Sequence, residues 1–148
     1  MTRVRPPVPA VANPQPLRFL VIPKVGHLWY DVVRGGAEAA AAMIQRQSGA
    51  AATIDYQAPA KAEVAAQAAL LQAAIRSRPT GITIDLLDAA RLRPLLEQAR
   101  QQGIAVNVFD SEPPAGLPLT SIGNDFCQQA RIASERLVQL LGGQGEVA

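Results

Sequence analysis

One short segment concentrates side chains that could bind a small polar molecule. Between positions 24 and 30 the chain carries a lysine, its only histidine, its only tryptophan and one of its two tyrosines: Lys24, His27, Trp29 and Tyr30. Aromatic residues make up only 4% of the sequence, so two adjacent rings are unusual here. Lysine supplies hydrogen-bond donors, and an indole or phenol ring can cover the C–H face of a sugar ring. The segment therefore favours a site for a small polyhydroxylated ligand.

Further polar side chains follow other short apolar runs of the chain. Asp85 ends one such run, Asp110 and Ser111 follow a second, and Asn124 and Asp125 follow a third. A carboxylate can accept hydrogen bonds from two adjacent hydroxyls, and an amide offers both donors and an acceptor. We expect these residues to join the first segment in one ligand-binding site.

Each candidate also has a simpler interpretation. The two adjacent aromatic residues could wedge a helix against a sheet. Asp110 and Asp125 could serve as a turn residue and a helix cap, and the cap is the favoured interpretation for Asp125. Lys24 and His27 could be ordinary surface residues. What favours a ligand site is the convergence of all the candidates at one predicted edge.

The elements that must position these residues alternate between strands and helices. Apolar runs and their stops predict five strands, at 17–22, 52–56, 81–86, 104–109 and 119–122. Apolar residues spaced by three and four predict helices at about 29–47, at 61–77, between Asp88 and Gly103, and from Asn124 or Asp125 to Leu141. Residues 146–148 look like the beginning of a sixth strand.

Three details of the helices carry expectations of their own. Pro94 falls past the first turn of its helix, where we expect a late start or a kink. In the last helix we expect Ala133, Leu137 and Leu140 to face inward. Cys127 lies early in that helix and is expected to be a small buried apolar residue.

Five strand–helix units indicate an α/β fold with a doubly wound, open parallel sheet and helices on both faces. The flavodoxin-like strand order is the arrangement we expect. In such sheets ligands bind outside the carboxyl ends of the strands, where every candidate residue above is placed.

Composition and missing motifs exclude several classes of function. The net charge of +2 comes from dispersed arginines, so nucleic-acid binding is not expected. The single cysteine excludes an internal disulfide and a cysteine-based metal site, and no metal site is expected. The phosphate-binding and hydrolase-nucleophile motifs G-x-G-x-x-G, G-x-x-x-x-G-K-[ST] and G-x-S-x-G do not occur. We therefore expect no cofactor, no catalytic residue and, since no apolar run is long enough, no membrane span.

The order of the motifs resembles the amino-terminal lobe of the type I periplasmic sugar-binding proteins, the ribose-binding-like solute receptors of ABC importers. The landmarks are residues 26–30 with 34–38, 67–75 with 81–84, 103–106 leading to 110–111, and 122–125 with 140–145. Pro23 and Lys24 directly after the first strand are typical of a branch with receptors for rhamnose and for autoinducer-2. In that branch the lysine and the aspartate that matches Asp110 contact the ligand. His27 and Leu28 replace an expected asparagine and proline, and Ser111 stands where the ribose-binding branch has an arginine, so sugar specificity is not transferred.

The resemblance implies a domain organisation and a setting. Residues 17–141 would be one lobe of a type I periplasmic-binding-protein fold, and 142–148 a hinge with the start of a missing second lobe. Residues 1–16 lie before the resemblance, and their five prolines indicate a Pro-rich flexible leader. The implied partners are a sugar-like ligand, the membrane subunits of an ABC importer and that second lobe. The implied location is the periplasm, although residues 1–16 show no apolar segment of a signal peptide.

Two other classes of function stay open. The effector-binding core of a LacI-type transcription regulator shares this lobe architecture, but residues 1–16 are too short and too rich in proline to form its helix-turn-helix. An enzyme built on a doubly wound sheet would need a site that no motif reveals.

Overall fold

The fold is built around an interior strand whose second half is buried on both faces. In the computed structural model, which describes residues 15–145, the strand β1 buries Leu20, Val21 and Ile22. All neighbouring strands pair in parallel, in the order β2-β1-β3-β4-β5. The strands are β1 (Leu17–Ile22), β2 (Ala52–Tyr56), β3 (Gly81–Ile84), β4 (Ala105–Phe109) and β5 (Thr120–Ile122). The predicted fold class and its flavodoxin-like strand order are thus confirmed.

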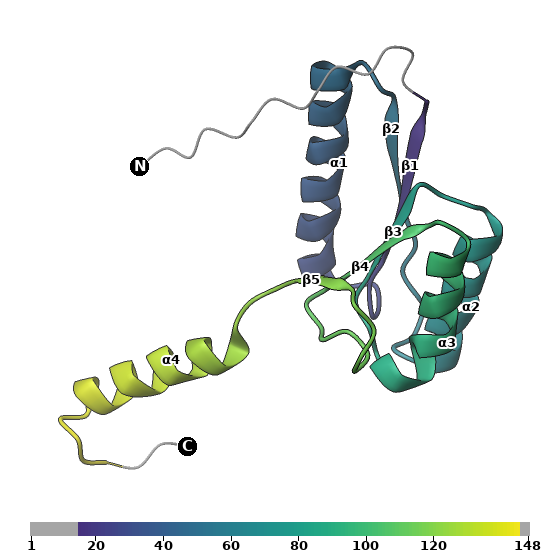
Figure 1. Ribbon diagram of the computed structural model, residues 1–148. Helices are drawn as coiled ribbons and strands as arrows, with labels where there is room; N and C mark the ends of the chain where they lie inside the picture. The colour runs from purple at the N-terminus through teal and green to yellow at the C-terminus, as the bar shows by residue number, and fades with distance from the viewer. Residues whose placement is uncertain (1–14, 146–148) are drawn as a thin grey trace.

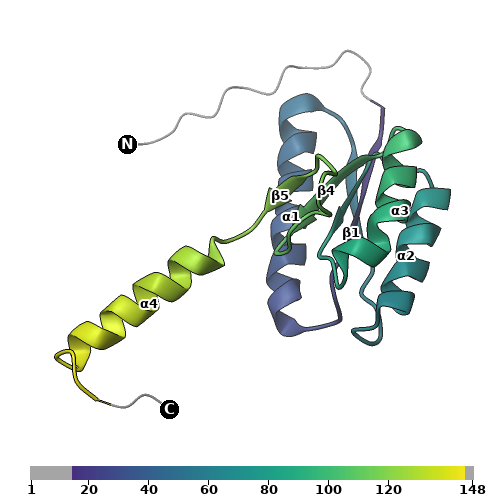
Figure 2. The ribbon, with the colours of Figure 1, turned by 60° about the horizontal axis from the view of Figure 1, so that its bottom comes forward.

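Helices cover the two faces of the sheet unequally. They are α1 (Leu28–Ser48), α2 (Val64–Arg76), α3 (Ala89–Gln101) and α4 (Phe126–Leu140). Helices α2 and α3 lie together on one face, whereas α1 alone lies on the other (Figures 1 and 2). The strands and helices fall where the sequence predicts them, with ends that differ by up to three residues.

Side-chain alternation along β1 explains how one strand serves both layers. Leu20 and Ile22 point to the larger core, which also holds Leu71 of α2 and Leu96 of α3. Val21 points the other way, into a smaller cluster with Tyr30 of α1 and with Phe109. Successive residues of a strand face opposite sides of the sheet, so the apolar run from Phe19 to Ile22 fits this interior position.

The prediction of a late helix start at Pro94 is wrong. Helix α3 begins at Ala89, directly after its cap Asp88, whose carboxylate accepts a hydrogen bond from the N–H of Arg91 at 2.9 Å. Pro94 lies inside the helix and removes the donor that would pair with the carbonyl of Ala90. Both residues are exposed, so water can hydrogen-bond that carbonyl and the helix continues.

The expected packing of the last helix is also wrong. Helix α4 leaves the sheet after β5 and runs away from the other elements (Figures 1 and 2). None of its residues is buried, so Ala133, Leu137 and Leu140 do not face inward, and Cys127 is exposed. The spacing of apolar residues predicted the helix and its apolar side correctly, but spacing does not reveal what a helix packs against.

Residues 1–14 and 146–148 lie outside the described residues, and with them most of the expected leader and the expected sixth strand. Among the residues described, no helix has the combined length and apolar character needed to cross a membrane.

Shortening a fully buried leucine should destabilise the fold. Leu96 of α3 is completely buried, and Leu96→Ala should lower the free energy of unfolding by about 2–5 kcal/mol, because lost burial and a residual cavity add together. The matched control is Leu28→Ala, at a side chain that is 81% exposed, with an expected effect within about 0.5 kcal/mol. Urea unfolding followed by circular dichroism measures both, and equal effects would contradict the core assigned here.

Candidate functional site

Strand register brings the predicted site residues to one edge of the sheet. Ile22 of β1 pairs with Ile84 of β3, and Ile84 pairs with Val108 of β4. The backbone N–H of Asp85 then donates to the carbonyl of Ile22 at 2.9 Å, which continues the pairing past the strand ends. The residues that follow β1, β3 and β4 therefore meet at the carboxyl edge, as parallel pairing requires.

A buried carboxylate lies at the centre of this edge. Asp85 is fully buried, and its Oδ2 accepts a hydrogen bond from the hydroxyl of Tyr30 at 2.8 Å. Its Oδ1 lies 2.9 Å from Nζ of Lys24, an ion pair in which Oδ1 accepts no well-angled hydrogen bond. Lys24 keeps about a third of its side chain exposed, so its ammonium joins the buried aspartate to the surface of the edge.

The ionisation of this cluster follows from its burial. Burial raises the pKa of Asp85, because a carboxylate loses its hydration, and the ammonium of Lys24 and the hydroxyl of Tyr30 offset only part of the shift. The pKa of Tyr30 is also raised, first by burial and then by its hydrogen bond to Asp85. Tyr30 therefore stays a neutral hydrogen-bond donor.

Gln67 completes the cluster, although the sequence did not single it out as a site residue. Its side chain, fully buried on α2, donates to the carbonyls of Pro23 at 3.1 Å and of Asp85 at 2.7 Å. Its Oε1 accepts from the N–H of Leu87 at 3.0 Å. One amide thus fixes the segments that follow β1 and β3. The only signal in the sequence was that Gln67 lies next to the apolar stripe of α2. The neighbouring Ala68 fits that stripe equally well, so the pattern did not indicate that Gln67 is buried.

His27 and the two aromatic residues occupy the turn between β1 and α1. His27 is exposed and is the cap of α1, where its Nδ1 accepts from the N–H of Trp29 at 3.1 Å. The rings of Trp29 and Tyr30 meet edge to face, with centroids 4.9 Å apart. Tyr30 also meets Phe109 edge to face at 6.3 Å. Tyr30 is buried and wedges α1 against the sheet, whereas Trp29 is 46% exposed and presents its ring to solvent.

The loop after β4 holds Asp110 and Ser111 in different roles. Asp110 has a left-handed backbone (φ 49°), and its N–H donates to the carbonyl of Ile122 at 2.9 Å. That conformation is uncommon for a residue other than glycine and is often found where a side chain must be aimed at a ligand. Ser111 instead joins two loops, because its hydroxyl accepts from the N–H of Leu86 at 2.9 Å.

Three of the predicted residues line one hollow of about 420 Å³, here called the carboxyl-edge hollow. Trp29, Asp110 and Asn124 contribute its polar and aromatic rim, and side chains of β1, β3 and α1 form its floor, among them the apolar Val21 and Ala37 and the hydroxyl-bearing Thr83. Asp110, Ser111 and Asn124 also line an adjoining hollow of about 240 Å³. Lys24, Tyr30 and Asp85 line neither hollow and form the cluster around the buried carboxylate of Asp85.

The remaining predicted residue, Asp125, caps α4. Its carboxylate accepts from the N–H of Gln128 at 2.9 Å, and it lines neither hollow. Within residues 15–145 no three His, Cys, Asp or Glu side chains come together as metal ligands would.

Removing the hydroxyl of Tyr30 should destabilise the fold. Tyr30→Phe leaves Oδ2 of the buried Asp85 without its donor and should lower the free energy of unfolding by about 1–3 kcal/mol. The chain offers a matched control in Tyr56→Phe, because the Tyr56 hydroxyl makes no hydrogen bond to a described residue, and a change within about 0.5 kcal/mol is expected. Urea unfolding of the two variants measures the difference, and equal stabilities would show that the hydroxyl of Tyr30 contributes nothing.

The raised pKa of Asp85 predicts an unusual pH dependence. The folded chain holds the proton of Asp85 to a higher pH than the unfolded chain does. The stabilisation that results is fully present below the ordinary aspartate pKa of about 3.9, and it is lost as the pH rises through the pKa of Asp85 in the folded chain. The free energy of unfolding of the wild type, relative to Asp85→Asn, should therefore fall as the pH rises above about 4. Unfolding curves across this range test it. A difference that grows with pH would show that Lys24 and Tyr30 outweigh burial.

Three solved structures that share this fold are solute-binding proteins of ABC transporters with a bound sugar. A solute-binding protein from Burkholderia graminis in complex with D-arabinose is 24% identical, with a TM-score of 0.79 over 91% of this chain and 45% of that one. A solute-binding protein from Agrobacterium vitis bound with alpha-D-tagatopyranose is 28% identical, with a TM-score of 0.74 over 87% and 45%. One from Clostridium phytofermentas with bound L-rhamnose is 22% identical, with a TM-score of 0.71 over 89% and 40%.

The chain spans less than half the length of these three proteins. A comparison with curated proteins found no significant match. A family model described as the periplasmic binding protein domain, however, matches residues 19–148. This match covers most of the sequence, and the chain belongs to the periplasmic binding protein domain family.

Proposed function

We propose that this chain is the amino-terminal lobe of a sugar-type solute receptor that serves an ABC importer outside the cytoplasm. The lobe comprises residues 17–141, and residues 142–148 begin the hinge to a second lobe. The observation that carries the proposal is the carboxyl-edge hollow, which places an exposed indole beside a carboxylate and an amide. Family membership and the three sugar-bound neighbours support it.

The hollow offers the contacts that a monosaccharide needs. The carboxylate of Asp110 can accept from two adjacent hydroxyls, the amide of Asn124 can both donate and accept, and the exposed ring of Trp29 can cover the C–H face of the sugar. Lys24 would contact the ligand through those N–H groups of its ammonium that do not point at Asp85. The ligand is bound and released unchanged.

Charge in and behind the hollow favours a neutral ligand. The ammonium of Lys24 is already compensated by Asp85 at 2.9 Å, so it is a poor partner for a second carboxylate. Asp110 adds a negative charge to the rim. A neutral sugar such as L-rhamnose, the ligand of one structural neighbour, fits this balance better than a sugar acid does. The pair Pro23 and Lys24 directly after β1 supports the rhamnose and autoinducer-2 branch.

In the complete receptor, ligand binding would close two lobes about the hinge, and the closed form would be what the importer recognises. A single lobe supplies only one wall. The second lobe would supply the opposite wall and add hydrogen bonds to the ligand. It would also exclude water from the hydrogen bonds that Asp110 and Asn124 make to the ligand.

We expect the isolated chain to bind neutral monosaccharides with a dissociation constant of about 1 mM or weaker, because half of the contacts and the exclusion of water are absent. Trp29 gives the only indole N–H signal in a ¹H–¹⁵N spectrum, so a titration with D-arabinose, D-tagatose, L-rhamnose and glucuronate reports directly from the rim.

Asp110→Asn should weaken binding about tenfold or more, since a hydrogen bond to a charged group is lost. The matched control, Asp31→Asn on the exposed first turn of α1, should leave binding unchanged.

Three outcomes of the titration would contradict the proposal. Micromolar affinity would show that one lobe is a complete site. Tighter binding of glucuronate than of the neutral sugars would reverse the charge argument. No shift of the Trp29 signal at sugar concentrations on the order of 100 mM would exclude a sugar site at this edge.

A further inference from the structure

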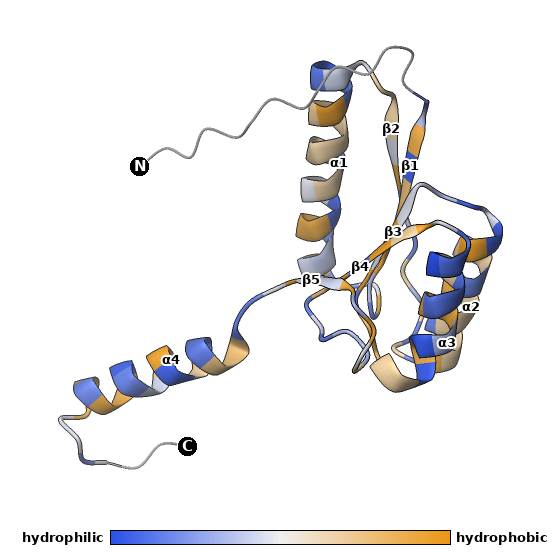
Figure 3. Cartoon of the chain, viewed as in Figure 1, coloured by the Kyte–Doolittle hydropathy of each residue, from blue (hydrophilic) through white to orange (hydrophobic). Residues whose placement is uncertain are grey.

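Asp85 lies at the carboxyl edge of the sheet, but its side chain is not placed to touch a ligand. It is fully buried, and it lines neither the carboxyl-edge hollow nor the adjoining one. The strands β1 and β3 that lead to it are predominantly apolar (Figure 3). A carboxylate in such surroundings loses its hydration, which costs stability unless partners compensate it. Any effect of Asp85 on a ligand must therefore pass through one of those partners.

Lys24 is the partner through which Asp85 can act on a ligand. Its ammonium lies 2.9 Å from Oδ1 of Asp85, and about a third of its side chain is exposed. Oδ1 accepts no well-angled hydrogen bond from a described residue, so attraction between opposite charges is what mainly holds the two groups together. Among residues 15–145, Lys24 makes no other ion pair. One buried carboxylate thus neutralises an ammonium that solvent can reach.

Neighbouring groups hold this pair in place whether or not a ligand is present. The hydroxyl of Tyr30 donates to Oδ2 of Asp85 at 2.8 Å, which fixes the carboxylate. The amide of Gln67 donates to the backbone carbonyls of Pro23 and Asp85, so the segments that carry the two charges are joined. The compensation of Lys24 is therefore a permanent property of the sheet edge.

We propose that Asp85 sets the charge preference of the sugar site: by neutralising Lys24, it makes the site select neutral sugars over sugar acids. Asp85 is a positioning residue, because it fixes where the ammonium of Lys24 lies and how much of its charge is left for a ligand. The proposal rests on the proposed function, in which Lys24 is one of the ligand contacts. It assigns the selectivity of that site to a single buried side chain that the sugar does not touch.

Removing the charge of Asp85 should therefore admit an anion. Asp85→Asn keeps the size of the side chain and an oxygen that can accept from Tyr30, but it leaves the ammonium of Lys24 uncompensated. The carboxylate of a sugar acid could then form a charge-assisted hydrogen bond with that ammonium, which is stronger than a bond to a neutral hydroxyl. The carboxylate of Asp110 stays on the rim and still repels an anion, so the measurable quantity is the ratio of two affinities.

D-glucose and D-glucuronate are a matched pair of probes, because they share a ring and differ only in the group at C6. The indole N–H signal of Trp29 reports the dissociation constant of each at pH 8, with sodium chloride added to match ionic strength. Asp85→Asn should lower the ratio of the glucuronate constant to the glucose constant by about fivefold or more. Asp31→Asn removes the same charge from the exposed first turn of α1 and should leave the ratio unchanged. L-rhamnose serves as a second neutral reference.

A pH profile of the wild type tests the same role without changing Asp85. Burial raises the pKa of Asp85, so lowering the pH from 8 to 4.5 should protonate it and release the charge of Lys24. Glucuronate stays an anion over this range, and the wild-type ratio should fall by about twofold or more. Lys24→Met removes the ammonium through which Asp85 acts, so its ratio should not show this fall.

The comparison with Lys24→Met isolates Asp85 from the other groups at this edge. The groups that face Asp85 are Lys24 after β1, the hydroxyls of Tyr30 on α1 and Ser111 after β4, and the amide of Gln67 on α2, and only Lys24 among them is charged. His27 and Asp110 also lie at this edge, but both chains contain them, so their contributions cancel.

Two results would overturn the role of Asp85 and leave the sugar site intact. One is a ratio that Asp85→Asn does not change although a neutral sugar still shifts the Trp29 signal. The other is a wild-type ratio that follows that of Lys24→Met across the pH range. If no neutral sugar shifts the Trp29 signal of the wild type, the sugar site itself is wrong, and the role of Asp85 is overturned with it.

Discussion

The candidate site depends on one carboxylate that has been taken out of water. Asp85 is fully buried at the end of β3, and a charge in that position is tolerated only where partners replace its hydration. Those partners come from two other elements, Lys24 after β1 and Tyr30 on α1. Because Tyr30 is fixed by this contact and by Phe109, its neighbour Trp29 is held with its ring toward solvent. The buried ion pair thus determines how the exposed part of the site is presented.

The two faces of the sheet contribute unequally to the core. Fourteen buried residues form the core between the sheet and the pair α2 and α3, whereas three form the cluster under α1. Most of the apolar burial that stabilises the chain therefore lies on the face away from the carboxyl-edge hollow. The α1 face can then tolerate a buried carboxylate, an exposed indole and a left-handed aspartate, each of which costs stability.

Local patterns of the sequence predicted much of this fold, because strands, helices and caps depend mainly on residues that are close together in the sequence. The apolar run at 17–22 marked the central strand, and Asp88 and Asp125 marked two helix starts. The sheet edge then followed from general topology, which is why Lys24 and Asp85 were named together. Their direct contact could not be predicted, since it depends on side-chain direction across two strands. Gln67 and the placement of α4 were missed for the same reason, because both depend on partners distant in sequence.

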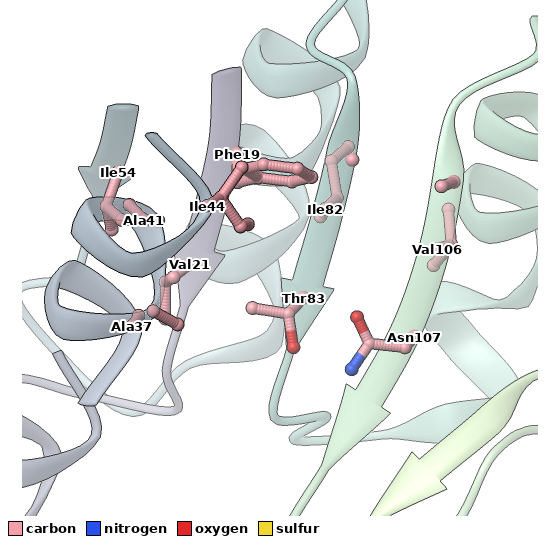
Figure 4. Close-up of a pocket in the computed structure, with 13 residues that line it drawn as sticks. Phe19, Val21, Ala37, Ala41, Ile44, Ile54, Ile82, Thr83, Val106 and Asn107 are labelled. Carbon is pink, nitrogen blue, oxygen red and sulfur yellow. The ribbon is translucent and has the colours of Figure 1, made fainter. Parts of the chain in front are cut away.

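The two hollows on the α1 face are not separate surfaces. Val21, Ala37 and Thr83 line both the carboxyl-edge hollow and a second hollow of about 340 Å³ between α1 and the sheet, the α1 groove (Figure 4), so three side chains belong to two walls at once. A substitution that improves the fit on one wall also reshapes the other. In design, these three positions can therefore be changed only with both hollows in view. Attempts to change ligand preference should therefore begin at the rim, where Trp29 and Asn124 belong to the carboxyl-edge hollow and not to the groove.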